Sequence, residues 1–164
     1  MVRMDTSLPA RLHRVALRAA WRALVAYRRV LRPRTEGACV LVWSGGGLLL
    51  VRHSYKPGYG VPAGMIGRGE DPAEAAAREL REEVGIQVSP DTLQQAGRVV
   101  SREHGNEDHL HFFELRLDDE PAFRVDAREI VWAGFHTLEE ALALDLLDAL
   151  RDQLEKGQGT DSTV

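Results

Sequence analysis

The fold is decided by the stretch Gly64–Ile86, which reads GMIGRGEDPAEAAARELREEVGI. Within it, Asp71 is suited to cap the N-terminus of a helix and Pro72 to occupy the first helical position. Glu74 stands where it completes a capping-box-like pair, and Gly85 stands where a left-handed residue commonly ends a helix. These signals predict a helix between the proline and the glycine, preceded by a glycine-rich loop.

The two sides of the predicted helix differ in chemistry. Residues at steps of three and four form an apolar stripe suited to a core: Ala73, Ala76, Ala77, Leu80 and Val84. Glu79, Glu82 and Glu83 share the other side, where their like charges repel and the helix C-terminus disfavours anions. A divalent cation such as Mg²⁺, which prefers oxygen ligands, would offset this repulsion. The alternative is a solvated acidic face, partly compensated by Arg78 and Arg81.

The spacing within this stretch matches a known signature. Gly64 is followed after five residues by Glu70 and, after seven more, by the run Arg78–Ile86 (RELREEVGI). This pattern resembles the complete Nudix box, the loop–helix–loop signature of the Nudix hydrolases. The resemblance extends over roughly 36–155. It implies an α/β fold, an α/β/α sandwich with a mixed sheet, and metal-dependent hydrolysis of the phosphoric anhydride bond in a nucleoside diphosphate linked to another moiety.

The resemblance also implies which residues hold the metal. Glu79 and Glu83 are similar to the main metal ligands of the family, and Glu82 would support a further metal or the attacking water. The backbone carbonyl of Ala63 is often a ligand in such proteins. Glu129, which opens a late strand, resembles an acid that supplies another ligand in some members. The implied cofactor is Mg²⁺, with Mn²⁺ as a substitute.

Other positions of the motif have structural roles in the family. Glu70 and Arg78 would form an ion pair that holds the loop against the helix, and we count Arg78 with the catalytic set. Gly64 would allow tight loop geometry, and Gly85 would end the helix. A general base should lie within hydrogen-bond reach of the attacking water, and the candidates are Glu82, Glu103, Glu107 and Asp108.

Outside the motif, short apolar runs separated by turn residues predict strands. A hairpin is expected at 38–43 and 48–52, joined by Ser44-Gly45-Gly46-Gly47, and the segment 53–69 is expected to be a loop. Further strands are predicted at 95–101, 109–117 and 129–135, followed by one helix over 138–155 that is capped by Thr137 and Glu140. Strands mixed with helices indicate a layered α/β domain.

Several side chains near the motif are candidates for binding substrate. His53, Tyr55 and Tyr59 are suited to stack on a base or sugar, or else to pack within the loop. Arg52 ends a strand and is suited to pair with a phosphate. The alternative is an ordinary surface arginine without a ligand. Glu103 belongs to a loop dense in titratable groups, which is typical of functional loops and also of ordinary polar ones.

The identity of the substrate rests on weaker resemblances. The run Val61–Ile66 (VPAGMI) resembles the loop of ADP-ribose pyrophosphatases, whereas 51–59 looks more like a broad group of poorly assigned bacterial Nudix proteins. We therefore expect a nucleoside diphosphate derivative such as ADP-ribose or a related nucleotide sugar. The alternatives are a non-catalytic Nudix-fold nucleotide sensor, and a pyrophosphohydrolase of nucleoside triphosphates or RNA 5′ ends.

The net charge of −4 hides a split between two parts of the chain. Residues 1–34 contain nine Arg and one acid, whereas 35–164 contain twelve Lys and Arg against twenty-four acids. Apolar and Arg residues alternate at helical spacing over 8–32, which predicts an amphipathic helix. This helix is expected to pack on the body or on a partner subunit, or else to lie on an anionic membrane. An Arg-rich, acid-poor N-terminus is also typical of organelle transit peptides.

The composition predicts one domain and excludes several classes of protein. We expect a basic helical extension over 1–34, a hydrolase domain over 35–156 and a disordered tail over 157–164. No apolar run reaches the roughly 20 residues that span a bilayer, and no signal-peptide core is present, so a cytoplasmic protein is expected. The single cysteine, Cys39, excludes an internal disulfide. The acidic body makes nucleic acid an unlikely partner for it, and the sequence leaves homodimerisation open.

Overall fold

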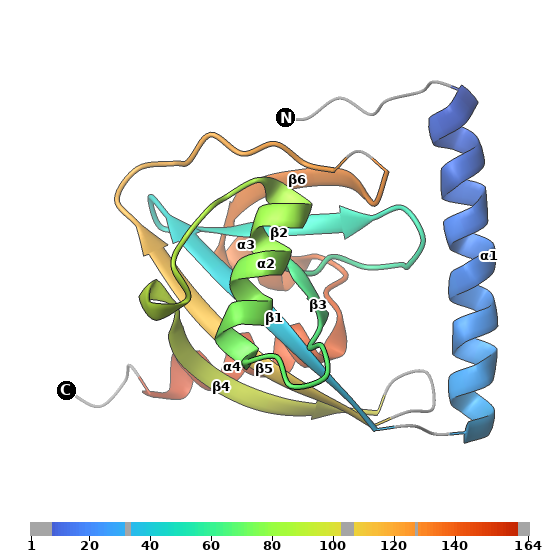
Figure 1. The fold of residues 1–164 in the computed structure, drawn as a ribbon. Helices are drawn as coiled ribbons and strands as arrows, with labels where there is room; N and C mark the ends of the chain where they lie inside the picture. Colours follow the sequence, from blue (N-terminus) through green and yellow to red (C-terminus); the bar gives the residue numbers. More distant parts are fainter. Residues whose placement is uncertain (1–7, 32–33, 103–106, 127, 161–164) are drawn as a thin grey trace.

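The computed structural model describes residues 8–31, 34–102, 107–126 and 128–160 (Figure 1). Glu103 therefore lies outside the described residues. The elements, in chain order, are α1 (Leu8–Leu31), β1 (Arg34–Ser44), β2 (Gly47–His53), β3 (Ala63–Met65), α2 (Pro72–Val84), η1 (Pro90–Thr92), β4 (Gln94–Ser101), β5 (Glu107–Leu117), β6 (Ile130–Thr137), α3 (Leu138–Ala143) and α4 (Asp148–Thr160).

The strands form one mixed sheet in the order β4-β5-β1-β2-β6, with β3 paired to β1. β1 runs parallel to β5, and the other strand pairs are antiparallel. The tight turn between β1 and β2 uses Gly45 and Gly46, whose φ angles of 55° and 80° favour glycine. The centre of β1 is apolar without alternation because both faces of the sheet are covered.

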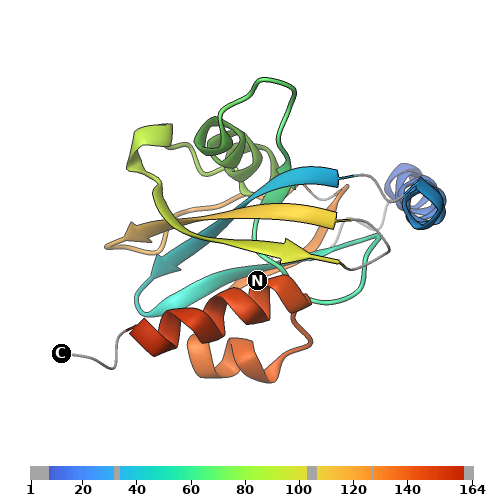
Figure 2. The ribbon, with the colours of Figure 1, turned by 90° about the horizontal axis from the view of Figure 1, so that it is seen from below.

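Helices cover the two faces of the sheet, as the view in Figure 2 shows. α2 lies on one face, where Leu80 and Val84 are fully buried in a core with Val40, Val42 and Leu49. α3 and α4 lie on the other face over a second core, to which they contribute Ala141, Ala149, Leu150 and Leu154. The predicted α/β/α sandwich is thereby confirmed.

The predicted helix over 72–84 is confirmed at both ends. The Asp71 side chain accepts a hydrogen bond of 2.8 Å from the Ala73 amide, so it caps the first turn. Gly85 adopts φ 72° and donates its N–H to the Arg81 carbonyl, which ends the helix. These local contacts fix the length of α2, and the length determines which acidic residues lie on its last turns.

Two sequence expectations need correction. The segment expected to be entirely loop contains the short strand β3, which pairs with β1 at Gly37–Cys39. The prediction of a single helix over 138–155 is wrong. The chain forms two helices, α3 and α4, and the residues between them make backbone hydrogen bonds with Tyr59. The Tyr59 amide donates to the Asp145 backbone carbonyl, and the Tyr59 carbonyl accepts from the Leu147 amide. α4 continues to Thr160, past the start of the predicted tail, and 161–164 lie outside the described residues.

The predicted N-terminal helix is present as α1, which has 24 residues and stands beside the sandwich rather than in either helix layer (Figures 1 and 2). In the part of the chain that the structure describes, no helix is long and apolar enough to cross a bilayer.

Candidate active site

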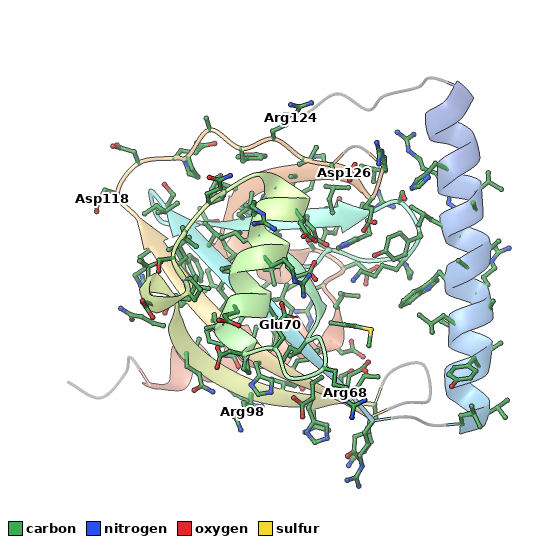
Figure 3. The ribbon with its side chains drawn as sticks, viewed as in Figure 1. Arg68, Glu70, Arg98, Asp118, Arg124 and Asp126 are labelled. Atoms are coloured by element: carbon green, nitrogen blue, oxygen red, sulfur yellow. The ribbon has the colours of Figure 1, made fainter. Side chains whose placement is uncertain are left out.

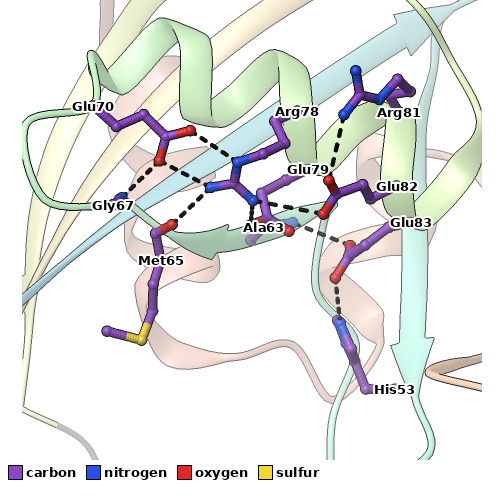
Figure 4. Close-up of polar contacts among 10 residues, drawn as sticks. All are labelled: His53, Ala63, Met65, Gly67, Glu70, Arg78, Glu79, Arg81, Glu82 and Glu83. Carbon is purple, nitrogen blue, oxygen red and sulfur yellow. Dashed lines mark hydrogen bonds and ion pairs between the residues drawn. The ribbon is translucent and has the colours of Figure 1, made fainter.

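Figure 4 shows the three glutamates of α2 with their polar contacts. They differ in their exposure to solvent. Glu83 is buried, with 6% of its surface exposed, whereas Glu79 is half-buried and Glu82 is exposed. The side of the helix that carries them borders β3 and the end of β2. A buried carboxylate is costly unless it is hydrogen-bonded or paired, so the partners of Glu83 and Glu79 define the site.

Glu83 is held from two directions by buried groups. His53 Nε2 lies 2.9 Å from its Oε1, and the Ala63 backbone N–H donates to its Oε2 at 3.2 Å. Burial lowers the pKa of His53, and the hydrogen bond to Glu83 opposes that shift. A neutral His53 donates from Nε2, because a carboxylate can only accept. These contacts orient the Glu83 carboxylate toward β3.

The sequence suggests that His53 stacks on a substrate or packs within a loop, whereas the structure places it on β2, in contact with Glu83. β2 places Leu49, Val51 and His53 on the face covered by α2, since alternate residues of a strand share a face. The first two are fully buried and His53 is 4% exposed. Strand alternation in the sequence puts His53 on the same face as Val51 and opposite Arg52, but it does not indicate which helix covers that face.

Glu79 lies against the backbone at Gly64. A Cβ atom at Gly64 would overlap the Glu79 carboxylate, so the absence of a side chain there is what admits this group. Arg78 Nη1 donates to Glu79 Oε1. Burial raises the pKa of Glu79 above its ordinary value, the contact with Arg78 opposes the shift, and the charges of Glu83 and Glu82 reinforce it. The ionised form of Glu79 therefore lacks full compensation.

These residues fit a hard divalent cation. The carboxylates of Glu79 and Glu83 both border the first residues of β3, where the chain adds the Ala63 carbonyl, and Glu82 stands on the same helix side. All of these donors are oxygen atoms, which Mg²⁺ prefers. Among the described residues, no three His, Cys, Asp or Glu side chains already converge as a metal cluster. A bound cation would compete with Arg78 for Glu79 and with His53 for Glu83.

The predicted ion pair between Glu70 and Arg78 is present and ties the loop to α2 (Figure 4). Arg78 Nε and Nη2 donate to the two oxygens of Glu70 at 2.8 and 3.0 Å. Arg78 Nη2 also donates to the Met65 carbonyl at 3.0 Å, and the Gly67 amide donates to Glu70 at 2.6 Å. This bidentate arrangement fixes the loop between β3 and α2.

Replacing Glu70 with Gln is expected to destabilise the protein in a pH-dependent way. The hydrogen bonds from Arg78 and Gly67 lower the pKa of Glu70 from 4.5 to about 2. A carboxylate with a depressed folded-state pKa stabilises the fold above its unfolded pKa, and the contribution is lost as the pH falls toward the folded value. Urea unfolding at about pH 7 and about pH 3 should therefore show a wild-type advantage that shrinks at the lower pH.

The exposed Glu74, in the first turn of α2, offers a matched control for that experiment. Glu74→Gln should lose only the weak attraction of a first-turn acid to the helix N-terminus, so its effect at about pH 7 should be well below that of Glu70→Gln. An advantage of wild type over Glu70→Gln that is equal at the two pH values would contradict a role for the ionised Glu70–Arg78 pair.

The loop that precedes β6 borders the same region. Its residue Asp126 lies near the C-terminal end of α2, at the opposite end from Glu70 (Figure 3). The Asp126 amide donates to the Glu83 carbonyl. Glu129 is half-buried, and its carbonyl accepts a 2.7 Å hydrogen bond from the Ser54 amide. Its charge acts on both His53 and Tyr55. The structure thus brings Glu129 near the His53 end of the site, and its role as a metal ligand stays a prediction.

The predicted substrate contacts fall into two groups. Tyr55 packs edge-on against His53, with ring centroids 5.3 Å apart, so it lies beside the site. Arg52 lies 5.8 Å over the ring of Tyr59, which packs against Trp132 in the core covered by α3 and α4. Arg52 and Tyr59 are therefore on the other face of β2 from the α2 carboxylates.

The other described acids considered as general bases, Glu107 and Asp108, lie on β5 rather than on α2. Glu107 contacts His109 and Arg102, and these contacts lower its pKa. Asp108 accepts a hydrogen bond from the Thr35 hydroxyl. Cys39 is buried, and burial raises its pKa to about 12, so the thiol is unreactive. Of the described candidates for a general base, Glu82 is the one on α2 beside the other two carboxylates.

Comparisons with known proteins agree with this geometry. The model of the NUDIX domain matches residues 33–156. An uncharacterized Nudix hydrolase of Pseudomonas aeruginosa is 36% identical over 135 residues, which cover 73% of this chain and 78% of that protein.

Solved structures share the fold at lower identity. A MutT protein from Methanosarcina mazei has a TM-score of 0.71 at 21% identity, covering 81% of this chain and 99% of that one. The NUDIX domain of Shewanella oneidensis NrtR, complexed with ADP ribose, has a TM-score of 0.68 at 15% identity, covering 81% of this chain and 92% of that one. The match to the NUDIX domain model and the similarity to the Pseudomonas protein show that the chain belongs to the Nudix hydrolase family.

Proposed function

We propose that this Nudix hydrolase cleaves the diphosphate of a nucleoside diphosphate linked to a second moiety, with ADP-ribose or a related nucleotide sugar as its substrate. The observation that carries the proposal is the meeting of Glu79 and Glu83 at the start of β3, one beside Gly64 and the other bonded to the Ala63 amide. A purely solvated acidic face has no need to bury Glu83 or to clear space for Glu79.

The proposed metal ligands are Glu79, Glu83 and the Ala63 carbonyl, supported by Glu82 and Glu129. When bound there, Mg²⁺ supplies charge neutralisation for the diphosphate and lowers the pKa of a coordinated water. His53 keeps the Glu83 carboxylate in one orientation. Without a bound cation, the carboxylates of this pocket would repel the anionic diphosphate.

Glu82 is the proposed general base. It is exposed to solvent, so water reaches it, and it shares a helix side with the two carboxylates that border β3. Arg78 Nη1 lies 3.6 Å from its Oε2 and Arg81 lies 3.4 Å from its Oε1, so the side chain is restrained by two cations. An attacking water hydrogen-bonded to Glu82 would transfer its proton there as the bond to phosphorus forms.

The choice of a nucleotide sugar rests on the run Val61–Ile66, which resembles the loop of ADP-ribose pyrophosphatases. We propose Tyr55, beside His53, as a surface on which a base or sugar stacks. Arg52 and Tyr59 lie on the other face of β2, so we do not assign them to the substrate. Glu103 stays a predicted substrate contact.

A panel of substrates tests the proposal. Purified protein is incubated with ADP-ribose, other nucleotide sugars, nucleoside triphosphates, dinucleoside polyphosphates and triphosphorylated RNA, in Mg²⁺ and in Mn²⁺, and the products are resolved. Metal-dependent release of AMP and ribose 5-phosphate from ADP-ribose is the expected result. Preferred release of pyrophosphate from nucleoside triphosphates would contradict the nucleotide-sugar assignment but would agree with the proposed catalytic residues. Tight nucleotide binding without any hydrolysis would instead favour the sensor interpretation.

A further inference from the structure

The outward face of α1 is apolar and uncovered. Val15 is 62% exposed, Tyr27 55% and Val30 80%, and Leu31 is exposed as well. Leu24 is also exposed, but it is nine residues from Val15 and so lies on the opposite side of the helix from it. Elsewhere among the described residues, the exposed large hydrophobic side chains are only Met65 and Val100. A solitary exposed apolar residue is ordinary, whereas a cluster along one helix marks an interaction surface.

The opposite side of α1 touches the body next to the active site. Arg18 Nε donates to the Ser54 carbonyl at 2.9 Å, and the rings of Trp21 and Tyr55 lie 5.7 Å apart. Trp21 and Val30 are about two and a half turns apart, so they lie on opposite sides of the helix. The helix therefore has an inner side already in use and an outer side that lacks a partner in the described chain.

The charge of α1 is of one sign. The sequence Leu8–Leu31 contains no Asp or Glu. Arg18 belongs to the inner side, whereas Arg22 is exposed and, seven residues after Val15, lies at the border of the outer face. The described part of the outer face between Val15 and Tyr27 carries alanines and apolar side chains. An apolar face bordered by arginines is typical of helices that lie in the plane of a membrane interface.

We propose that the outer face of α1 lies on an anionic lipid surface. Such a surface supplies an apolar layer for Val15, Tyr27 and Val30 and negative charge for Arg22 at the border of that face, on a helix without any acid. The helix binds in the plane of the interface, because no helix of the described chain is long and apolar enough to span a bilayer.

A second copy of the chain fits this face less well. Two α1 helices packed together would bring like charges close, with no acid on either helix to pair with them. The acidic body of a second copy would attract the arginines. However, its described surface exposes only Met65 and Val100 as large hydrophobic residues, and they cannot cover a face that extends from Val15 to Leu31.

Binding of the full-length protein to vesicles tests the inference. Co-sedimentation is measured with vesicles of phosphatidylglycerol and phosphatidylcholine and with vesicles of phosphatidylcholine alone, at about 50 and about 300 mM salt. We expect binding to the anionic vesicles that weakens at the higher salt. The combined variant Val15→Gln, Tyr27→Gln and Val30→Gln should reduce that binding about tenfold or more. The variant Arg22→Gln should reduce it about fivefold.

Val100→Gln is the matched control, since it removes an exposed apolar side chain from β4 rather than from α1. It should bind as wild type does. Circular dichroism and hydrolytic activity without vesicles verify that the α1 variants remain folded. Sedimentation equilibrium of wild type and the combined variant is measured in parallel.

Three outcomes would overturn the inference. The first is a lack of binding to anionic vesicles by the wild-type protein. The second is equal binding by wild type and the combined variant. The third is a dimer that the combined variant abolishes without any vesicle binding, which would assign the face to a second copy. These outcomes do not depend on which nucleotide the site hydrolyses.

Discussion

Replacing Glu83 with Gln is expected to reduce turnover about 100- to 1,000-fold while leaving the fold intact. A metal supplies several kcal/mol of transition-state stabilisation, and each 1.4 kcal/mol corresponds to about a tenfold change in rate. Gln has nearly the same shape as Glu. Its amide oxygen can still accept from the Ala63 amide, while its NH2 group faces His53, whose Nε2 can accept in the other neutral tautomer. The change therefore removes the charge that holds the cation while keeping the contacts that hold the side chain.

The measurement is steady-state hydrolysis over a range of Mg²⁺ concentrations, with thermal unfolding recorded for each protein. Glu74→Gln makes the same chemical change on the same helix, at an exposed position in its first turn. It should retain wild-type turnover. Turnover of Glu83→Gln that equals wild type at every Mg²⁺ concentration would contradict a metal role for Glu83.

The second large effect is expected from Gly64→Ala. The added methyl group would overlap the Glu79 carboxylate, and the flexible end of Glu79 can move more easily than the paired backbone of β3. The carboxylate should therefore leave its place. Displacing a catalytic group by about 1 Å can reduce the rate about a hundredfold, so a loss of this size is expected with little change in stability.

Gly157→Ala is the control for this substitution, because a methyl group at that position meets no other atom within 4 Å. Turnover, the Mg²⁺ concentration for half-maximal activity and the unfolding midpoint are compared for the three proteins. If Gly64→Ala hydrolyses substrate as fast as wild type at low Mg²⁺, then the position of Glu79 beside β3 is unimportant for catalysis.

The parts of the site that depend on local sequence could be predicted. The residues of α2 follow from its caps at Asp71 and Gly85, which act within one turn of the helix. The pair Glu70–Arg78 is implied by the resemblance to the Nudix box, in which both positions are specified. These interactions join residues close in the chain, so their geometry changes little with the rest of the fold.

The parts that depend on distant contacts could not be predicted in the same way. The hydrogen bond between His53 and Glu83 joins β2 to α2 and needs the register of the sheet. β3 is three residues long and contains a glycine, so its pairing with β1 leaves little trace in the sequence. The break between α3 and α4 arises because Tyr59 pairs with Asp145 and Leu147 through backbone groups.

The N-terminal helix shows a third situation. Its helical spacing was evident, but apolar residues occur around much of its circumference, so the sequence did not indicate which side faces the body. The structure resolves this through Arg18 and Trp21, which contact Ser54 and Tyr55. The side left over is the one that we propose to bind lipid.

The central claim is that Glu79, Glu83 and the neighbouring Ala63 carbonyl form a cation site. Equilibrium titration with Mn²⁺, followed by electron paramagnetic resonance without substrate, tests it most directly in wild type, Glu83→Gln and Glu74→Gln. Saturable binding to wild type and to Glu74→Gln, weakened about tenfold or more in Glu83→Gln, is the predicted result. Equal Mn²⁺ affinity in all three proteins, or no saturable binding to wild type, would contradict the account.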